Sequence, residues 1–125
     1  MILGLGVDLC PVDRLERILA RHETSFIERV FTEAEQTYAK SAVNRGERLA
    51  ARFAVKEATI KALRAPAGLR WRDMEVAKRH DGAPVLVLHG AAKACADTLG
   101  VTTTHVSISH AGNMAVAMVV LEGER

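Results

Sequence analysis

The sequence is poor in aromatic residues, and its opposite charges nearly balance. One tryptophan, one tyrosine and three phenylalanines in 125 residues provide no row of rings on which nucleic-acid bases could stack. A net charge of +2 is too small to favour a nucleic acid as partner. These two shortages argue against the class of nucleic-acid-binding proteins.

Cysteines and long apolar runs are also scarce. Cys10 and Cys95 lie far apart without a Cys-x-x-Cys motif, so we predict two small, buried, reduced residues and neither a zinc site nor a disulfide framework. No apolar run approaches the roughly 20 residues of a membrane span. The apolar N-terminus lacks the basic region and cleavage site of a secretory signal, so we predict a cytoplasmic protein with no membrane partner.

The composition is that of a folded globular protein. Apolar residues make up 49% and charged residues 26% of the chain, which excludes disorder. The length favours one compact domain over residues 1–125, and the sequence contains no repeats or linkers.

The segment Arg52–Leu63 predicts a helix around which the rest of the chain is arranged, because it has no glycine or proline and is rich in good helix formers. Lys56 points into the apolar stripe of this helix, and the ordinary interpretation of such a residue is that its ammonium extends to water. The stripe itself should face the core: Leu49, Phe53, Ile60 and Leu63.

A flank of the same helix carries Glu57 and Lys61, one turn apart. Ala54 and Ala50 precede them on this flank, which predicts a track of small residues where a ligand could lie close to the backbone. The alternative is an ordinary pair of charges on a helix surface, worth ~0.2–0.5 kcal/mol.

The segment Ile2–Asp8 predicts a strand that ends in an acid. Gly4 and Gly6 share one face of it and permit close approach of another group. Asp8 stands where strand ends commonly present ligand-binding groups. It could instead cap the next helix, but Pro11 is better placed as the first helical residue, which leaves Asp8 too early for a cap.

A helix is predicted from Pro11 to His22, with a strip of arginines opposite its apolar face. The patterns Ser25-x-x-Glu28 and Thr32-x-x-Glu35 are capping boxes that predict two short helices. Two further segments should interrupt helical structure, one before and one after the central helix: Asn44–Arg48 and Ala65–Gly68.

The second half of the chain predicts mostly strands. Met114–Leu121 is apolar on both faces and must be covered on both sides. The few amphipathic helices can cover one side, so we expect a second copy of the chain on the other and therefore a homo-oligomer. The predicted elements are the strands Met74–Lys78, Val85–Leu88, Thr104–Ser109 and Met114–Leu121, the helix Gly90–Leu99 and the turn His110–Asn113.

Together, Asp8 and Glu57 offer two carboxylates to a hard cation such as Mg²⁺, which proteins often hold with one or two carboxylates and substrate phosphates. Lys61, with Lys56 and Arg52, could neutralise those phosphates. These residue types predict a site for a phosphate ester or phosphoanhydride. The sequence has no motif for a protein nucleophile, so we favour direct transfer to an outside acceptor.

At these residues the chain resembles the 4′-phosphopantetheinyl transferases of the short holo-[acyl-carrier-protein] synthase type. The resemblance extends over essentially the whole chain and depends on three motifs: Gly4-x-Gly-Val-Asp8, Arg52-Phe-Ala-Val-Lys-Glu-Ala58 with Lys61, and Val106-Ser-Ile-Ser-His110.

The resemblance implies an α+β fold in which a small, mainly antiparallel sheet packs against a long central helix. It implies a homotrimer with active sites between protomers, coenzyme A as donor and a serine of apo acyl carrier protein as acceptor in fatty acid biosynthesis. The second product would be adenosine 3′,5′-bisphosphate.

It also implies roles for individual residues. Asp8 and Glu57 would bind Mg²⁺, with Mn²⁺ as a substitute, and Lys61 would contact the pyrophosphate as the third catalytic residue. The nucleotide end of coenzyme A would lie near Arg52, Gly82, Pro84, Ser109 and His110. An acidic carrier protein would dock on Arg14, Arg17 and Arg21.

Two loops depart from the family pattern. The loop after the central helix reads Arg64-Ala-Pro-Ala-Gly68 where many relatives have a Gly-Thr-Gly-like sequence, and Gly82-Ala83-Pro84 lacks the usual basic residue. Two rival classes stay open, a coenzyme-binding module without catalysis and a structural oligomer. The sequence does not specify the carrier proteins used, the tolerance for acyl-coenzyme A or the general base.

Overall fold

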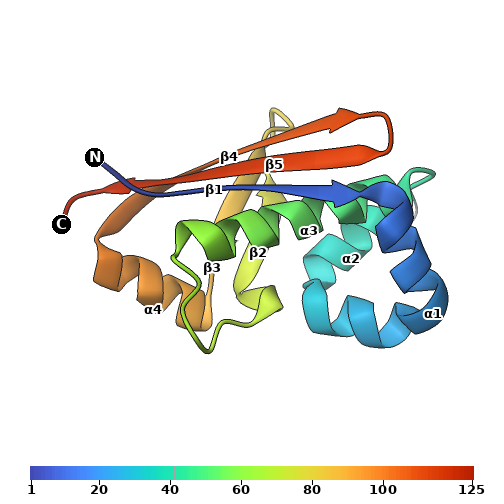
Figure 1. Cartoon of the computed structure of the whole chain (residues 1–125), viewed down its shortest axis with the longest axis horizontal. Helices are drawn as coiled ribbons and strands as arrows, with labels where there is room; N and C mark the ends of the chain where they lie inside the picture. The colour runs from blue at the N-terminus through green and yellow to red at the C-terminus, as the bar shows by residue number, and fades with distance from the viewer. Residues whose placement is uncertain (41) are drawn as a thin grey trace.

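The computed structural model describes residues 1–40 and 42–125. A three-stranded antiparallel sheet, in the order β1-β5-β4, lies over one long helix, α3, and a second, two-stranded sheet is formed by β2 and β3 (Figure 1). The predicted α+β class, with a small antiparallel sheet against a long central helix, is confirmed. In chain order the elements are β1 (Ile2–Pro11), α1 (Val12–Val30), α2 (Glu33–Lys40), α3 (Arg45–Ala62), the 3-10 helix η1 (Trp71–Asp73), β2 (Met74–Lys78), β3 (Pro84–Leu88), α4 (Gly90–Leu99), β4 (Val101–Ala111) and β5 (Met114–Gly123).

Two glycines allow α3 to pack directly against β1. A Cβ atom at Gly4 would lie 2.1 Å from the carbonyl oxygen of Ala62, and one at Gly6 would lie 1.9 Å from that of Ala58. No side chain fits in either place, so backbone meets backbone at this contact. The close approach predicted from the two glycines is therefore made by the protein's own helix.

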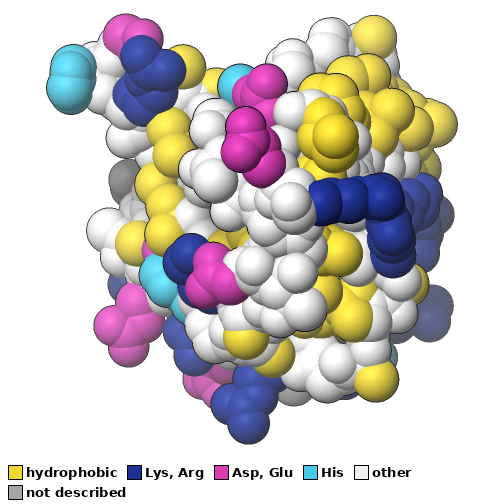
Figure 2. Space-filling model, turned by 90° about the vertical axis from the view of Figure 1, so that its left-hand side faces the viewer, with side chains coloured by type: hydrophobic (Ala, Val, Ile, Leu, Met, Phe, Trp, Pro, Cys, Tyr) yellow, Lys and Arg dark blue, Asp and Glu magenta, His cyan; other side chains and the backbone are white. Residues whose placement is uncertain are grey.

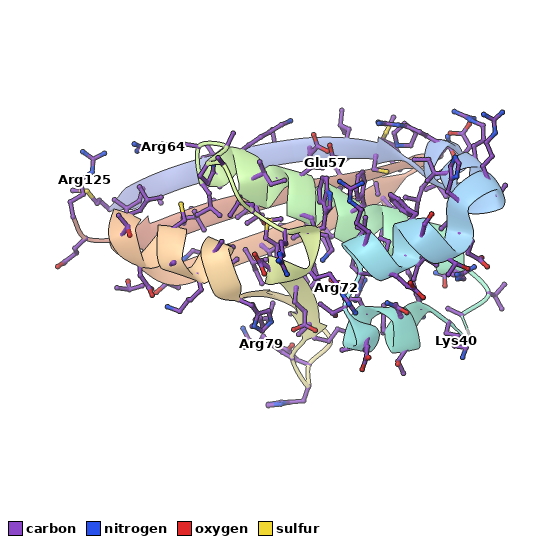
Figure 3. All side chains as sticks on the ribbon, turned by 90° about the horizontal axis from the view of Figure 1, so that it is seen from below. Lys40, Glu57, Arg64, Arg72, Arg79 and Arg125 are labelled. Carbon is purple, nitrogen blue, oxygen red and sulfur yellow. The ribbon has the colours of Figure 1, made fainter. Side chains whose placement is uncertain are left out.

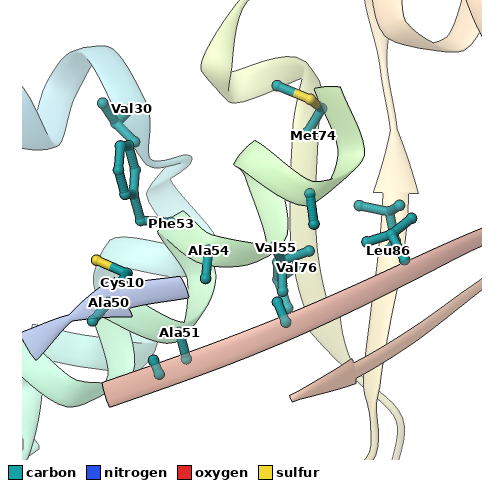
Figure 4. Packing of buried hydrophobic residues seen from close by; sticks show 14 of the residues in the cluster. Cys10, Val30, Ala50, Ala51, Phe53, Ala54, Val55, Met74, Val76 and Leu86 are labelled. Carbon is teal, nitrogen blue, oxygen red and sulfur yellow. The ribbon is translucent and has the colours of Figure 1, made fainter. Parts of the chain in front are cut away.

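Residues of α3 form the centre of the hydrophobic core. Ala54, Val55 and Ala58 are completely buried, and the core continues from α3 to Cys10 at one end and to Leu86 on β3 at the other (Figure 4). The many alanines of α3 let the sheet approach closely, whereas Phe53 fills the wider space toward Phe26 of α1 and Trp71.

The first part of the chain differs from the prediction at two boundaries. β1 runs to Pro11, so Asp8 pairs with Ala117 inside the strand and does not end it. Pro11 precedes the first helical residue instead of being that residue. The predicted helix end at His22 is confirmed as a kink, where φ is −138° and ψ is 38°, and a second helical segment continues α1 to Val30.

One of the two capping boxes is present. Thr32 and Glu35 exchange hydrogen bonds between side chains and backbone amides, as predicted for the start of α2. The other is wrong, because Ser25 lies inside α1 and its hydroxyl donates to the carbonyl of His22. The break predicted at Asn44–Arg48 is also wrong, since α3 already begins at Arg45.

The remaining boundaries follow the sequence closely. β2 and α4 have the predicted bounds, and Gly100 ends α4 in the left-handed conformation. The turn between β4 and β5 is tighter than predicted, because β4 continues through His110 to Ala111 and leaves only Gly112 and Asn113 in the turn. None of the described helices is long and apolar enough to cross a membrane.

One face of the larger sheet carries no helix. On this open face, apolar side chains of β1 stand opposite those of β5, with Val7 paired to Met118, and both remain about half exposed. The open face lies uppermost in Figure 1, and hydrophobic side chains gather at the upper right in Figure 2. Its apolar members are Leu5, Val7, Leu9, Val116, Met118 and Val120.

Candidate active site

Asp8 of β1 and Glu57 of α3 lie next to each other where the helix crosses the strand. Figure 3 shows Glu57 beside β1. Burial, followed by the negative charge of Asp8, raises the pKa of Glu57 to about 7. Two segments far apart in sequence thus place two carboxyl groups close enough to repel each other.

Lys61 completes this cluster. Its ammonium donates to Asp8 Oδ1 at 2.7 Å and to the carbonyl of Val7 at 3.1 Å, which leaves its third donor free. The hydrogen bond to Asp8 raises the pKa of Lys61, so the side chain stays charged. Lys61 therefore pairs with Asp8 across two elements, and within the described residues the ordinary pair of Glu57 and Lys61 along the helix is not formed.

The cluster has the properties of a site for a hard cation. Glu57 Oε1 is buried and has no hydrogen-bond partner, which is costly for a carboxylate oxygen. A cation shared with Asp8 would supply that missing partner and remove the repulsion between the two carboxylates. Two carboxylates leave most of the coordination shell to water and ligand oxygens, and no cluster of three metal-ligating side chains exists among the described residues.

The predicted behaviour of Lys56 is wrong. Its side chain is fully buried and does not reach water. The ammonium forms an ion pair with Glu35 Oε1 at 2.8 Å, although Glu35 was expected to serve only the capping box of α2. Sequence reasoning missed this pair, because nothing in the spacing of residues 35 and 56 indicates contact.

The track of small residues is likewise not open to a ligand. Ala50 and Ala54 are completely buried in the core, together with Cys10 of β1. Burial and the nearby Glu57 raise the pKa of the Cys10 thiol to about 11, so it stays protonated. The approach to Glu57 is therefore from the side of Lys61 and Arg14.

Arg52 belongs to a second cluster, which lies around Tyr38 of α2. The guanidinium of Arg52 lies 3.9 Å from the centre of the Tyr38 ring and is almost completely buried. Arg48 at 4.4 Å and Lys78 at 4.6 Å approach the same ring. No salt bridge to a carboxylate is formed by these three cations within the described residues, and Arg52 Nε has no hydrogen-bond partner. The lone tyrosine of the sequence gave no signal for this arrangement.

The other residues predicted to contact the nucleotide lie on exposed turns and strand ends. Gly82 has φ +89° in the β2–β3 turn, and Pro84 begins β3. Ser109 and His110 are exposed on β4, and His110 lies in the row that crosses the sheet through Ala115 to Cys10. No hydrogen bond or ion pair joins these residues to the carboxylate pair in the described part of one protomer.

The arginines of α1 border a hollow of about 350 Å³. Arg14 is near enough to Glu57 to lower its pKa, against the larger effect of burial, so the hollow adjoins the carboxylate pair. Arg17 lies 3.5 Å from Asp13 in an exposed pair. The residues around the hollow are Arg14, Arg17, Ile18, Arg21 and His22.

Comparison with known proteins identifies the family. A family model described as the 4′-phosphopantetheinyl transferase superfamily matches residues 4–119. The chain belongs to the 4′-phosphopantetheinyl transferase superfamily.

Individual members of the superfamily are similar over nearly their full lengths. The holo-[acyl-carrier-protein] synthase of Anaeromyxobacter dehalogenans is 49% identical over 126 residues, covering 98% of each chain. The Helicobacter pylori synthase, in complex with coenzyme A, is 30% identical with a TM-score of 0.82 over 94% of this chain and 99% of that one. The Bacillus anthracis synthase, in complex with coenzyme A (3′,5′-ADP), is 35% identical with a TM-score of 0.80 over 99% of both.

The match to the superfamily model includes both carboxylates and the lysine of the cluster. It also includes the loop Arg64–Gly68, which the sequence distinguished from the family pattern. In that loop Arg64 and Ala65 adopt φ of +67° and +50°, a conformation that suits glycine, and Arg64 donates to the carbonyl of Leu3 at 3.3 Å. The chain thus keeps the turn without the glycines that would favour it.

Proposed function

We propose that this protein is a holo-[acyl-carrier-protein] synthase. It transfers the 4′-phosphopantetheine group of coenzyme A to a serine of apo acyl carrier protein and releases adenosine 3′,5′-bisphosphate. The observation that carries the proposal is the cluster of Asp8, Glu57 and Lys61 in a chain of this superfamily. We also propose Mg²⁺, replaceable by Mn²⁺, as the cation held by the two carboxylates.

In the reaction, the serine oxygen forms a bond to the phosphorus that carries the pantetheine, and the pyrophosphate bond breaks. When bound, the cation would stabilise negative charge on the phosphate oxygens. Asp8 and Glu57 would hold the cation from two elements that are packed backbone to backbone. Lys61 would donate its third hydrogen to the leaving phosphate, and its bond to Asp8 keeps the ammonium in place.

The cations around Tyr38 support binding of a phosphate-bearing end of coenzyme A near α2. Three positive charges lie near one ring, and none of them forms a salt bridge to a carboxylate of the described residues, so together they attract an anion. Arg52 is the member predicted from the sequence, and Lys78 could replace the basic residue missing from the Gly82–Pro84 turn. Gly82, Pro84, Ser109 and His110 remain predicted contacts to the nucleotide.

Two macromolecular contacts belong to the proposal. The open face of the sheet is apolar over two strands, which favours the predicted homotrimer, with sites completed between protomers. The strip of Arg14, Arg17 and Arg21 fits an acidic carrier protein, and Ile18 gives its centre an apolar contact. The cytoplasmic location and the role in fatty acid biosynthesis stay predictions.

The decisive experiment incubates apo acyl carrier protein with coenzyme A, Mg²⁺ and this protein, and measures the mass of the carrier. We expect a gain of one phosphopantetheine group, lost with EDTA and reduced by orders of magnitude in Asp8→Asn and Glu57→Gln. Cys10→Ser, at a buried neighbour that offers no carboxylate, is the matched control and should keep most of the activity. Near-normal transfer in EDTA or in either carboxylate variant contradicts the cation site.

The same experiment separates the two rival classes. A coenzyme-binding module would bind coenzyme A tightly without divalent metal and leave the carrier mass unchanged. A structural oligomer would show no coenzyme A binding, and Glu57→Gln would leave its measurable properties unchanged. The raised pKa and the unpartnered oxygen of Glu57 disfavour the second rival, because an ordinary surface carboxylate has neither.

A further inference from the structure

The buried ion pair of Lys56 and Glu35 ties four elements together behind the carboxylate site. The two charged groups are 2.8 Å apart, and both side chains are fully buried. The ammonium also donates to two backbone carbonyls, while the carboxylate accepts from two backbone amides. These partners are the carbonyls of Trp71 and Met74 and the amides of Thr32 and Val76.

The free energy of unfolding does not explain why such a pair is present. Removing two charges from water costs about as much as their attraction and hydrogen bonds return, and well-packed apolar residues often serve stability equally well. Hydrogen bonds differ from apolar packing in being directional. A lysine whose three donors all form hydrogen bonds in the core fixes its helix in one position and rotation, whereas a methionine at the same site would pack well in several.

The placement of α3 decides where Glu57 points. Lys56 and Glu57 are neighbours in sequence, so their side chains leave the helix about 100° apart. On the side of β1, α3 presents the backbone of Ala58 and Ala62 to Gly4 and Gly6, a smooth contact without interlocking side chains. A rotation of α3 by about 20° would move a carboxylate about 5 Å from the axis by roughly 2 Å. Catalytic constellations tolerate only about 0.5 Å.

Among the described residues, no donor forms a hydrogen bond to the buried oxygen of Glu57. Its position relative to Asp8 therefore depends on the rotation of α3. We propose that Lys56 and Glu35 are positioning residues, which fix this rotation and so aim Glu57 at the cation that it shares with Asp8. The inference deepens the proposed function and depends on its cation site.

The test replaces the pair in the full chain by Lys56→Met with Glu35→Gln, which keeps the volume of both side chains and removes both charges. Binding of Mn²⁺ is measured without substrates by electron paramagnetic resonance. We expect a cooperatively folded protein whose Kd for Mn²⁺ is raised about tenfold or more. In turnover, the Mg²⁺ concentration for half-maximal rate should rise more than kcat falls. Leu86→Ala is the matched control. Leu86 lies opposite Val76, so this variant damages the core next to the pair but leaves both charges and all of the pair's hydrogen-bonding groups in place, and its Mn²⁺ affinity should match that of the unaltered protein.

Glu35→Gln alone is measured in parallel, and it serves if the double variant does not fold. Its amide cannot accept from both Lys56 and the Val76 amide with the same two oxygens, so we expect intermediate weakening of Mn²⁺ binding. An unchanged Mn²⁺ affinity in either folded variant overturns the positioning role. A failure of the unaltered protein to bind Mn²⁺ would instead remove the cation site of the proposed function.

Discussion

At the scale of single residues, the environment of each carboxylate decides its role. Glu35 is neutralised by a lysine and satisfied by two amides, so it is a structural anion. Glu57 is half-buried beside Asp8, and one of its oxygens has no hydrogen-bond partner among the described residues, so we expect it to bind a cation. Glutamates on neighbouring helices therefore differ in chemistry because of the groups that surround them.

Removing Asp8 should return the pKa of Glu57 toward its ordinary value. In metal-free protein we expect Glu57 to titrate near pH 7, and at lower pH in Asp8→Asn, because the charge of Asp8 contributes to the raised pKa. Carbon-13 NMR of labelled glutamate carboxyls measures both values. A Glu57 that titrates identically in the two proteins would show that the carboxylates do not interact.

The same shift predicts how stability depends on pH. The folded protein keeps the proton of Glu57 up to about pH 7, whereas the unfolded chain loses it near the ordinary value of 4.5. Unfolding between these values releases a proton, so the Glu57 contribution lowers the free energy of unfolding as pH rises through this window. Urea titrations of metal-free protein should show this slope, and it should be weaker in Asp8→Asn.

At the scale of elements, the contact between α3 and β1 places the two carboxylates together. The contact depends on the absence of side chains at Gly4 and Gly6, because the helix backbone occupies the space. In the loop that follows α3 the reverse holds, because Arg64 and Ala65 occupy positions of positive φ, where glycine would be favoured. These two features predict that adding a methyl group at Gly6 destabilises the protein, whereas removing the one at Ala65 stabilises it.

Gly6→Ala should separate α3 from β1. The added Cβ would lie 1.9 Å from the carbonyl oxygen of Ala58, so we expect a loss of stability of about 1–3 kcal/mol or more and weakened Mn²⁺ binding. Gly82→Ala is the control, because nothing lies within 4 Å of that position and only its φ of +89° resists alanine. Equal losses measured by urea unfolding for the two variants would contradict the tight contact.

Ala65→Gly should stabilise the protein. Ala65 has φ +50°, where glycine is favoured over alanine by roughly 1 kcal/mol, so strain at the end of α3 is relieved. The neighbouring Ala67 is outside this conformation, and Ala67→Gly should lower stability slightly through the entropy of the unfolded chain. Thermal unfolding of the two variants should therefore shift in opposite directions.

At the scale of the whole molecule, two surfaces are candidates for contacts with other chains. The open face of the sheet exposes apolar side chains on β1 and β5, and the strip of arginines on α1 adjoins the carboxylate pair. We expect the first surface to contact copies of the chain and the second to contact an acidic carrier protein. The N- and C-termini lie at the opposite end from α1 (Figure 1), clear of the arginines.

A charge on the open face should prevent assembly. Val7→Lys places an ammonium among half-exposed apolar side chains that we expect to be buried between protomers, where an unpaired charge is costly. Light scattering at micromolar concentration should show a trimer for the unaltered protein and smaller species for the variant. Val43→Lys, the same substitution at a fully exposed valine outside this face, should leave the trimer intact. An active monomer would refute the oligomer.

Reversing the charges of Arg14 and Arg21 to Glu should weaken docking of the carrier. Exposed ion pairs contribute about 0.2–1 kcal/mol each, so two reversals should raise the KM for carrier protein on the order of tenfold at low salt. The effect should shrink as salt rises, and coenzyme A binding should stay nearly intact. Reversing Lys93 and Arg125, away from α1, controls for net charge. Unchanged carrier kinetics would place the docking surface elsewhere.

The sequence by itself determined the α+β class, most of the strands and α4, and it singled out Asp8, Glu57 and Lys61, which the structure places together. Periodicity, turn residues and short motifs are local signals, and these features depend on them. The first turns of α3, from Arg45 to Ala51, were missed, since tertiary packing stabilises helical turns that Gly46 and the polar residues around it disfavour. Only the tertiary structure decided which groups are partners. Lys61 forms its ion pair with Asp8 and not with Glu57, and Lys56 forms one with Glu35 in the core. Residues that pair across dozens of positions cannot be recognised from local spacing in the sequence, because only the fold sets the distance between their side chains.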